Sequence, residues 1–257
     1  MTGAREAQLI DAADMLLDAR RTLTPIDDLP QELRPVSAEE VDFIQDQIAD
    51  AFGPVGGWKV GAGSLEATPA AAPMPRAWIA PSGSLLAAAT HRLRGIEAEI
   101  AFLLGGDLPP RATPYSYDEV YAAVASCHPV IEVLESGLTH PIDPAVQMSK
   151  DADLQMHGGL IFGAAWPDWK SVDFIRKERV TLAVDGVVRV EKTGSNTSGN
   201  LLRLLPWLAN EGAARTGGLT AGQWITTGSW TGNTLAMRGS IADVHFSTMG
   251  MVGLRFE

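Results

Sequence analysis

The sequence predicts an α+β protein whose body is rich in strands and carries helices at its N-terminal end. The first fifty residues have the apolar spacing of helices, and strand patterns outnumber helical ones after residue 58. Long helices do not alternate regularly with the strands, which argues against a doubly wound parallel sheet. We therefore expect an N-terminal helical segment over residues 1–57 and a strand-rich catalytic domain over residues 58–257, packed as one compact unit.

Two helices are expected before the strand-rich part. Residues 7–21 repeat leucine and alanine at helical spacing, which gives one apolar stripe. Ser37 is followed three positions later by Glu40, the pattern of a capping box, and the helix over 41–52 ends near Gly53-Pro54. Because each helix has a single apolar face, each needs another surface to pack on.

The rest of the chain reads mainly as strands joined by turns. Asp185-Gly186 is the two-residue signal of a hairpin. The alanine- and proline-rich residues 62–85 and the polar residues 137–157 are interpreted as irregular, and the first is long enough to cover a substrate. The expected strands and helices are strands over 58–63, 97–105, 128–136, 158–166, 180–192, 223–229 and 244–257, and helices over 115–127 and 201–214.

Composition narrows the class of function. Lysine and arginine number 20 against 31 acidic residues, so the net charge is −11. Such a surface repels phosphate backbones and anionic lipids, which disfavours nucleic acid and membrane as partners. The lone Cys127 excludes an internal disulfide and cysteine-rich metal sites. The N-terminus has no signal-peptide pattern, so we expect a cytoplasmic protein.

Three glutamates are the candidate metal ligands. If residues 97–105 form a strand, Glu97 and Glu99 point to the same face. Glu132 lies inside an aliphatic run, where an ionised carboxylate is costly unless it is paired or bound to metal. Three carboxylates suit a hard cation, Mg²⁺ or Mn²⁺. The alternatives are a solvated Glu-x-Glu face and an ion pair between Glu132 and a lysine or arginine.

Lys59 is a candidate active-site residue, since it lies between Trp58 and a glycine turn. A half-buried lysine near a metal can bind a substrate carboxylate or move a proton. The alternative is a lysine at a strand edge that extends its charge into solvent.

These segments together resemble one known group of proteins over nearly the whole chain. FIQDQIADAF, GWKVG, GIEAEIAFLLGGDLP, HPVIEVLES, LPWLAN and ITTGS carry the resemblance. The chain resembles the 2-keto-4-pentenoate hydratase and 4-oxalocrotonate decarboxylase group of the fumarylacetoacetate hydrolase superfamily. The resemblance implies a fumarylacetoacetate-hydrolase-like fold, in which the N-terminal helices pack on the strand-rich body. It implies a homo-oligomer as well. It also implies that Glu97, Glu99 and Glu132 are metal ligands and that Lys59 is a catalytic, substrate-binding lysine.

The resemblance also implies a chemistry. The metal would chelate the carboxylate and the 2-oxo or 2-enol oxygen of a small 2-oxo acid or 2-hydroxydienoate and stabilise its enolate. The leading hypothesis is a lyase that hydrates a 2-hydroxy-2,4-dienoate to a 4-hydroxy-2-oxo acid. The alternatives are a decarboxylase or a C–C bond hydrolase with the same metal ligands, and a non-catalytic protein that binds a 2-oxo acid.

The sequence departs from the group around the substrate. Pro81 falls about where the group carries an acidic residue, and Met156 replaces a serine, while Asp153 is retained. Asp153, Thr227 and Ser229 are the candidates for binding the substrate. His157 is a candidate substitute for a lost proton donor, with a loop histidine of no role as the alternative.

Overall fold

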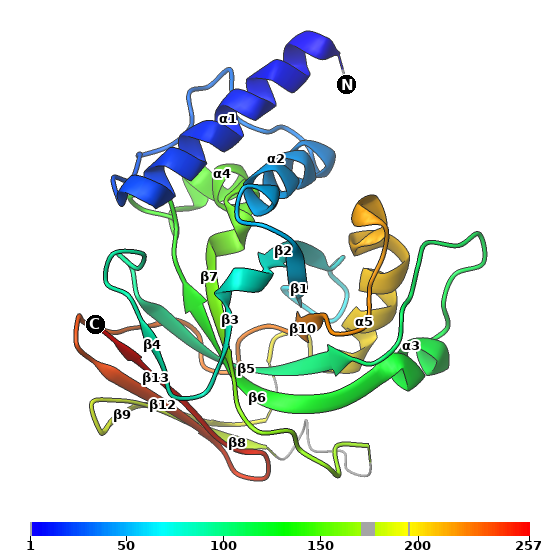
Figure 1. Ribbon diagram of the computed structural model, residues 1–257, viewed down its shortest axis with the longest axis vertical. Helices are drawn as coiled ribbons and strands as arrows, with labels where there is room; N and C mark the ends of the chain where they lie inside the picture. The colour runs from blue at the N-terminus through cyan, green and yellow to red at the C-terminus, as the bar shows by residue number, and fades with distance from the viewer. Residues whose placement is uncertain (1, 171–177, 195) are drawn as a thin grey trace.

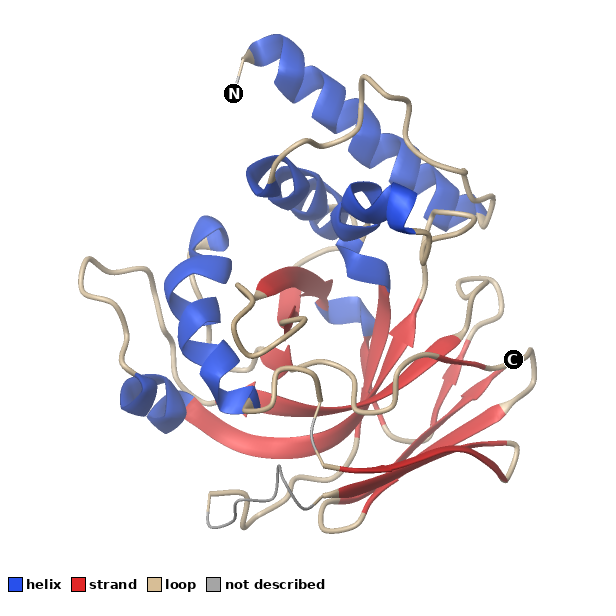
Figure 2. Ribbon diagram, turned by 180° about the vertical axis from the view of Figure 1, so that it is seen from behind, coloured by secondary structure: helices blue, strands red, loops and turns tan. Residues whose placement is uncertain are grey.

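The computed structural model describes residues 2–170, 178–194 and 196–257 and has the predicted α+β architecture. Figure 1 shows the helices α1 (Gly3–Thr22), α2 (Ala38–Asp50) and α4 (Gln147–Ala152) together at one end, above the sheets. The view from behind shows the same separation, with most strands gathered at the opposite end (Figure 2).

The larger sheet has the order β2-β1-β10-β5-β6-β7-β3, and β11 adds to β5. β1 pairs with β10, and β3 with β7, in parallel, while the other pairs are antiparallel. Its strands are β1 (Val55–Gly61), β2 (Ala70–Pro75), β3 (Ile79–Pro81), β5 (Gly95–Leu104), β6 (Val124–Leu134), β7 (His157–Phe162), β10 (Trp224–Thr226) and β11 (Thr234–Leu235).

The smaller sheet packs its apolar face against the larger one. Its order is β4-β13-β12-β8-β9. The main hydrophobic core joins alternate residues of β5 and β6, such as Ile100 and Ile131, to those of β8, β12 and β13, such as Leu182, Val244 and Leu254. The strands are β4 (Ser84–Leu86), β8 (Arg179–Val184), β9 (Val187–Thr193), β12 (Ile241–Phe246) and β13 (Gly250–Phe256).

The N-terminal helices form a hydrophobic cluster of their own. Leu16 of α1 and Ile44 of α2 are fully buried in it, together with Leu154 from the segment that precedes β7. The Ser37 side chain accepts a hydrogen bond from the backbone N–H of Glu40, as predicted for the start of α2. This cluster therefore brings the two helices against the segment that leads into β7.

Three predicted segments differ from the structure. Residues 62–85 contain β2, β3 and β4 rather than one irregular loop; β2 is an edge strand, where prolines are tolerated. The helix predicted over 115–127 is shorter, α3 (Tyr117–Ala123), because the following residues pair with β5 as the start of β6. The polar residues 137–157 include α4.

The remaining helical part agrees with the prediction for 201–214. A 3₁₀ turn (Leu201–Arg203), α5 (Leu204–Trp207) and a π-helical turn (Leu208–Gly212) follow one another there. Within the described ranges, no helix is both long and apolar enough to cross a membrane.

At Gly57, β1 passes close to the backbone of β10. A Cβ atom at Gly57 would lie 2.3 Å from the carbonyl oxygen of Trp224, its partner in the parallel pair. We expect Gly57→Ala to lower the free energy of unfolding by about 1–3 kcal/mol, the usual cost of overpacking. Gly61→Ala on the same strand is the control, because nothing lies within 4 Å of its Cβ position. Equal urea midpoints for the two variants would contradict this account.

Candidate active site

The pairing of β5 with β6 brings the three glutamates together. Glu97 lies directly opposite Glu132 in the antiparallel register, and Glu99 follows on the same face of β5. One carboxylate oxygen from each of the three lies within 4.8 Å of the others. Ile96 points to the opposite face, into the core, so the predicted alternation of β5 is confirmed.

The three carboxylates repel one another because they are close together and buried or half-buried. Like charges directly opposite on a sheet destabilise it, and Glu99 and Glu132 are each only 1% exposed. Burial and the Glu132 charge raise the pKa of Glu97 to about 7, against the opposing effects of Lys59 and a hydrogen bond from Ser229. Burial and the two neighbouring carboxylates raise the pKa of Glu99 well above its usual value.

Lys59 supplies a positive charge beside the cluster. Its Nζ lies 2.8 Å from Oε1 of Glu132 and donates to the backbone carbonyl of Gln155 at 2.9 Å. Burial favours the neutral amine, but the three glutamates outweigh it, so the pKa of Lys59 is raised. Because the ammonium points into the cluster from a strand that is not at the sheet edge, it is not a lysine extended into solvent.

Glu132 is the most constrained of the three carboxylates. Burial raises its pKa, but the Lys59 ammonium and a hydrogen bond from His157 outweigh burial and bring the pKa to about 2. Its Oε1 faces both partners, whereas Oε2 is buried without a hydrogen-bond partner in the described part of the chain. A buried ionised oxygen with no partner is costly, so Oε2 is a position that a cation fits.

His157 lies behind Glu132. Its Nδ1 lies 2.9 Å from Oε1 of Glu132, and the ring is fully buried. Burial lowers the pKa of His157 despite that hydrogen bond, which favours a neutral ring. Since an ionised carboxylate only accepts, Nδ1 carries the proton. The side chain thus orients Glu132 from behind, as hydrogen-bonded partners of metal ligands commonly do.

Hydroxyl side chains at the end of β10, including the predicted Thr227 and Ser229, hold the glutamates and the neighbouring strand. Thr226 donates to Oε2 of Glu99, and the N–H of Gly228 donates to the same oxygen at 2.9 Å. Thr227 donates instead to the carbonyl of Ile100 at 2.7 Å. Ser229 hydrogen-bonds to Glu97. The sequence pattern indicated hydroxyls near a substrate, and the structure adds direct contacts from Thr226 and Ser229 to the carboxylates.

Asp153 has a different position from the one expected for a substrate ligand. Its side chain is fully buried and forms an ion pair with Arg20. The second oxygen accepts from the hydroxyl of Ser136 at 2.6 Å and from the N–H of Gly137 at 2.8 Å. Both oxygens of Asp153 are therefore engaged within the protein.

A cavity of about 280 Å³ opens beside Lys59 and Glu97. Met156 lies on its wall, whereas Pro81 lies on β3, paired with Phe162 of β7. The sequence did not single out several other lining residues, because only long-range packing brings their segments to the cavity. The missed residues are Leu134, Ile142, Lys150, Asp151, Gln155 and Asn233.

Two adjacent threonines provide a matched test of this arrangement. Thr226→Val removes the hydroxyl that donates to Glu99, so we expect the affinity for Mn²⁺ to fall roughly 10-fold or more, as for other partners of metal ligands. Thr227→Val removes a bond to a backbone carbonyl instead and is expected to lower stability by about 1 kcal/mol without changing affinity. Titration calorimetry with Mn²⁺ and thermal unfolding measure the two effects. Equal Mn²⁺ affinities in the two variants would contradict the assignment.

Comparison with known proteins bears on both the fold and the site. No family model matches the chain. The chain is 28% identical over 166 residues to the 2-oxo-hept-4-ene-1,7-dioate hydratase of Escherichia coli, a match that covers 63% of the chain and 61% of that relative. The aligned region thus spans less than two thirds of the relative's length.

Solved structures give broader coverage. The 4-oxalocrotonate decarboxylase of Pseudomonas putida G7, complexed with magnesium and adipate, superposes with a TM-score of 0.82 at 23% identity over 98% of both chains. Another structure of that protein contains calcium and acetate. A fumarylacetoacetate hydrolase family protein of Yersinia pestis CO92, described as putative, gives a TM-score of 0.58 at 17% identity, over 79% of this chain and 93% of that one.

The comparisons confirm the fold and the resemblance that the sequence predicted. The chain shares its fold, with N-terminal helices packed on a strand-rich body, with the decarboxylase, and its strand-rich body resembles that of the fumarylacetoacetate hydrolase family protein. In sequence it is similar to the 2-oxo-hept-4-ene-1,7-dioate hydratase, and in fold it is similar to the 4-oxalocrotonate decarboxylase. The decarboxylase was solved with a divalent metal ion, and this chain carries the three-carboxylate cluster.

Proposed function

We propose that this protein is a divalent-metal-dependent lyase that hydrates a 2-hydroxy-2,4-dienoate to a 4-hydroxy-2-oxo acid. The observation that carries the proposal is the set of three buried or half-buried carboxylates beside Lys59, at the edge of a cavity. The similarity to a named hydratase supports the choice of reaction. The proposed homo-oligomer, the cytoplasmic location and the division at residue 57 remain predictions.

The donor set fits a hard cation. Glu97, Glu99 and Glu132 offer only oxygen ligands, and Oε2 of Glu132 is without a partner among the described residues. These three residues would hold Mg²⁺ or Mn²⁺. When bound, the ion supplies a Lewis acid that polarises the substrate's carboxylate and 2-oxo oxygens and stabilises negative charge on the enolate.

The chain's own groups account for binding and proton movement. Lys59 lines the cavity as an ammonium, so it is placed to bind the substrate carboxylate and to exchange a proton with the reacting carbon. Leu134 and Met156 make part of the wall apolar and suit a hydrocarbon diene, while Asn233 offers an amide to a polar end. Thr226 and His157 hold two of the carboxylates in place.

A decarboxylase or a C–C bond hydrolase is the second candidate. Its support is the superposition on a 4-oxalocrotonate decarboxylase over 98% of both chains. Met156 also lines the cavity at a position where, by the resemblance, the hydratase and decarboxylase group has a serine, which changes the groups available to direct water.

Metal removal and product analysis test the proposal. The protein is treated with EDTA, dialysed, and assayed with and without added Mg²⁺ or Mn²⁺ on 2-hydroxypenta-2,4-dienoate and on a 2-oxo-dioate. A hydratase adds water to the dienoate, whereas a decarboxylase releases CO₂ from the dioate, and mass spectrometry separates the products. Activity that is indifferent to both EDTA and metal would contradict the proposal. If oxalate with metal raises the melting temperature but neither substrate turns over, the protein is a binding protein.

A further inference from the structure

A strained turn lies directly before β7. Leu154, Gln155 and Met156 have φ values of 51°, 51° and 66°, three consecutive non-glycine residues in the left-handed region. Each such residue is strained, because the left-handed conformation brings its Cβ atom too close to the following carbonyl oxygen. A run of three persists only where surrounding contacts hold it.

The turn determines what faces the carboxylate cluster. It directs the carbonyl of Gln155 at Nζ of Lys59, 2.9 Å away. It also places Gln155 and Met156 on the cavity wall. The next residue is His157, whose ring hydrogen-bonds to Glu132 at 2.9 Å. A change in the turn would therefore move groups that contact Lys59 and Glu132 together.

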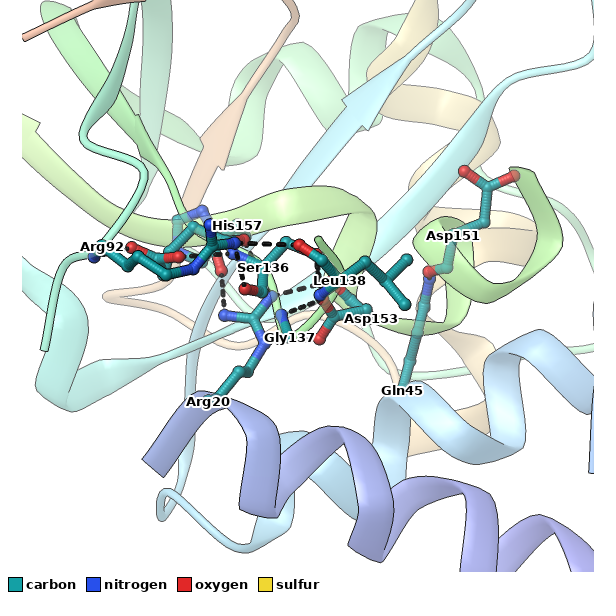
Figure 3. A network of polar contacts seen from close by, with 10 residues as sticks. Arg20, Gln45, Arg92, Ser136, Gly137, Leu138, Asp151, Asp153 and His157 are labelled. Atoms are coloured by element: carbon teal, nitrogen blue, oxygen red, sulfur yellow. Dashed lines mark hydrogen bonds and ion pairs between the residues drawn. The ribbon is translucent and has the colours of Figure 1, made fainter. Parts of the chain in front are cut away.

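Arg20 of α1 bridges the two ends of this turn. Its Nη2 donates to the carbonyl of Asp153 at 2.9 Å, and its Nη1 donates to the carbonyl of His157 at 2.9 Å. Nη2 also reaches the carbonyl of Glu135 at 3.1 Å, just beyond the end of β6. Figure 3 shows the side chain extending from α1 into this group of residues. One guanidinium thus ties the residues on both sides of the turn to the end of β6.

The charge of Arg20 is balanced within the same network. Its Nε forms an ion pair with the Asp153 carboxylate, which also accepts from Ser136 and Gly137. Arg20 is only 7% exposed, and its guanidinium donates four hydrogen bonds to protein acceptors. An ammonium is a point charge and cannot span both carbonyls as the planar guanidinium does.

We infer that Arg20 is a positioning residue, which holds the 154–156 turn so that the Gln155 carbonyl and the His157 ring meet Lys59 and Glu132. Helix α1 therefore helps to maintain the geometry of the site through Arg20, although none of its side chains lines the cavity beside Lys59. The effect on turnover rests on the proposed function. The effect on the conformation of the turn is independent of the proposed function.

The test compares Arg20→Met and Arg20→Lys with Arg21→Met. Arg21 is the next residue on α1 and contacts Phe52 and the carbonyl of Ala51 instead. Hydrogen–deuterium exchange of metal-free protein reports on residues 153–158, and titration with Mn²⁺ reports on the cluster. For Arg20→Met we expect faster exchange confined to 153–158, and a roughly 10- to 100-fold loss in Mn²⁺ affinity and kcat. Arg21→Met should match the wild type within about 2-fold.

Arg20→Lys keeps a positive charge beside Asp153 and covers the case in which Arg20→Met does not fold. It is expected to lose protection at 153–158 with only a small change in melting temperature. Wild-type exchange and Mn²⁺ affinity in a folded Arg20→Lys or Arg20→Met protein would overturn the inference. Loss of local protection without any turnover by the wild type would instead count against the proposed function alone, because the exchange measurement needs no substrate.

Discussion

Replacing Glu132 by glutamine is expected to lower the affinity for Mn²⁺ by at least about 100-fold and to abolish metal-dependent turnover. The amide keeps the shape of the side chain but removes the charge that a divalent cation requires. Removing one member of a buried, hydrogen-bonded charge pair also lowers the free energy of unfolding by about 3–5 kcal/mol, because the remaining partner loses its counterion. Here that partner is the Lys59 ammonium, 2.8 Å from Oε1.

Titration calorimetry with Mn²⁺ measures this loss, and Glu119→Gln is its control. Glu119 is an exposed glutamate on α3, paired with Arg111, and lies outside the carboxylate cluster. Its replacement should leave Mn²⁺ affinity unchanged. If Glu132→Gln binds Mn²⁺ as tightly as Glu119→Gln does, the three-carboxylate site is not where the metal binds.

The part of the site that the sequence predicted depends on local periodicity. The two-residue repeat of a strand is sufficient to put Glu97 and Glu99 on one face and Ile96 on the other, as the structure has them. The aliphatic run around Glu132 likewise indicated a buried strand. The register that sets Glu97 opposite Glu132 is a long-range pairing, however, and neither segment alone contains it.

The part that could not be predicted depends on contacts between distant segments. Arg20 and Asp153 are separated by 133 positions, and nothing in either segment indicates that they form an ion pair. The resemblance implied that Asp153 binds a substrate, whereas the structure pairs it with an arginine. The left-handed turn at 154–156 contains no glycine, so the usual sequence signal for such a turn is missing.

The shortened helix α3 has the same kind of cause. Residues 124–127 continue the helical pattern of the sequence, but they lie where β5 offers backbone partners, and Cys127 pairs with Phe102. Tertiary pairing thus overrides local preference. As a result β6 is one long strand, Val124–Leu134, that carries Glu132 deep into the sheet.

Lys59→Met should separate the role of the lysine from that of the glutamates. Methionine keeps an unbranched apolar side chain, but it can neither transfer a proton nor bind a carboxylate. We expect kcat to fall by about 10²–10⁴, the usual contribution of a proton-transfer group. Mn²⁺ affinity should stay the same or increase, because the ammonium no longer competes for Oε1 of Glu132. Both substitutions are therefore expected to lower turnover, but only Glu132→Gln is expected to weaken Mn²⁺ binding.

Lys150→Met is the matched control, because Lys150 lines the same cavity but hydrogen-bonds to Gln147 rather than to the cluster. It should retain kcat within a few-fold. Without metal, Lys59→Met leaves the buried Glu132 without its ammonium partner, so its melting temperature should be lower and should rise more on adding Mn²⁺ than that of the wild type. A Lys59→Met protein that loses metal affinity in parallel with activity would show that Lys59 mainly maintains the geometry of the carboxylates. Retained affinity with lost turnover would place the lysine in the chemistry itself.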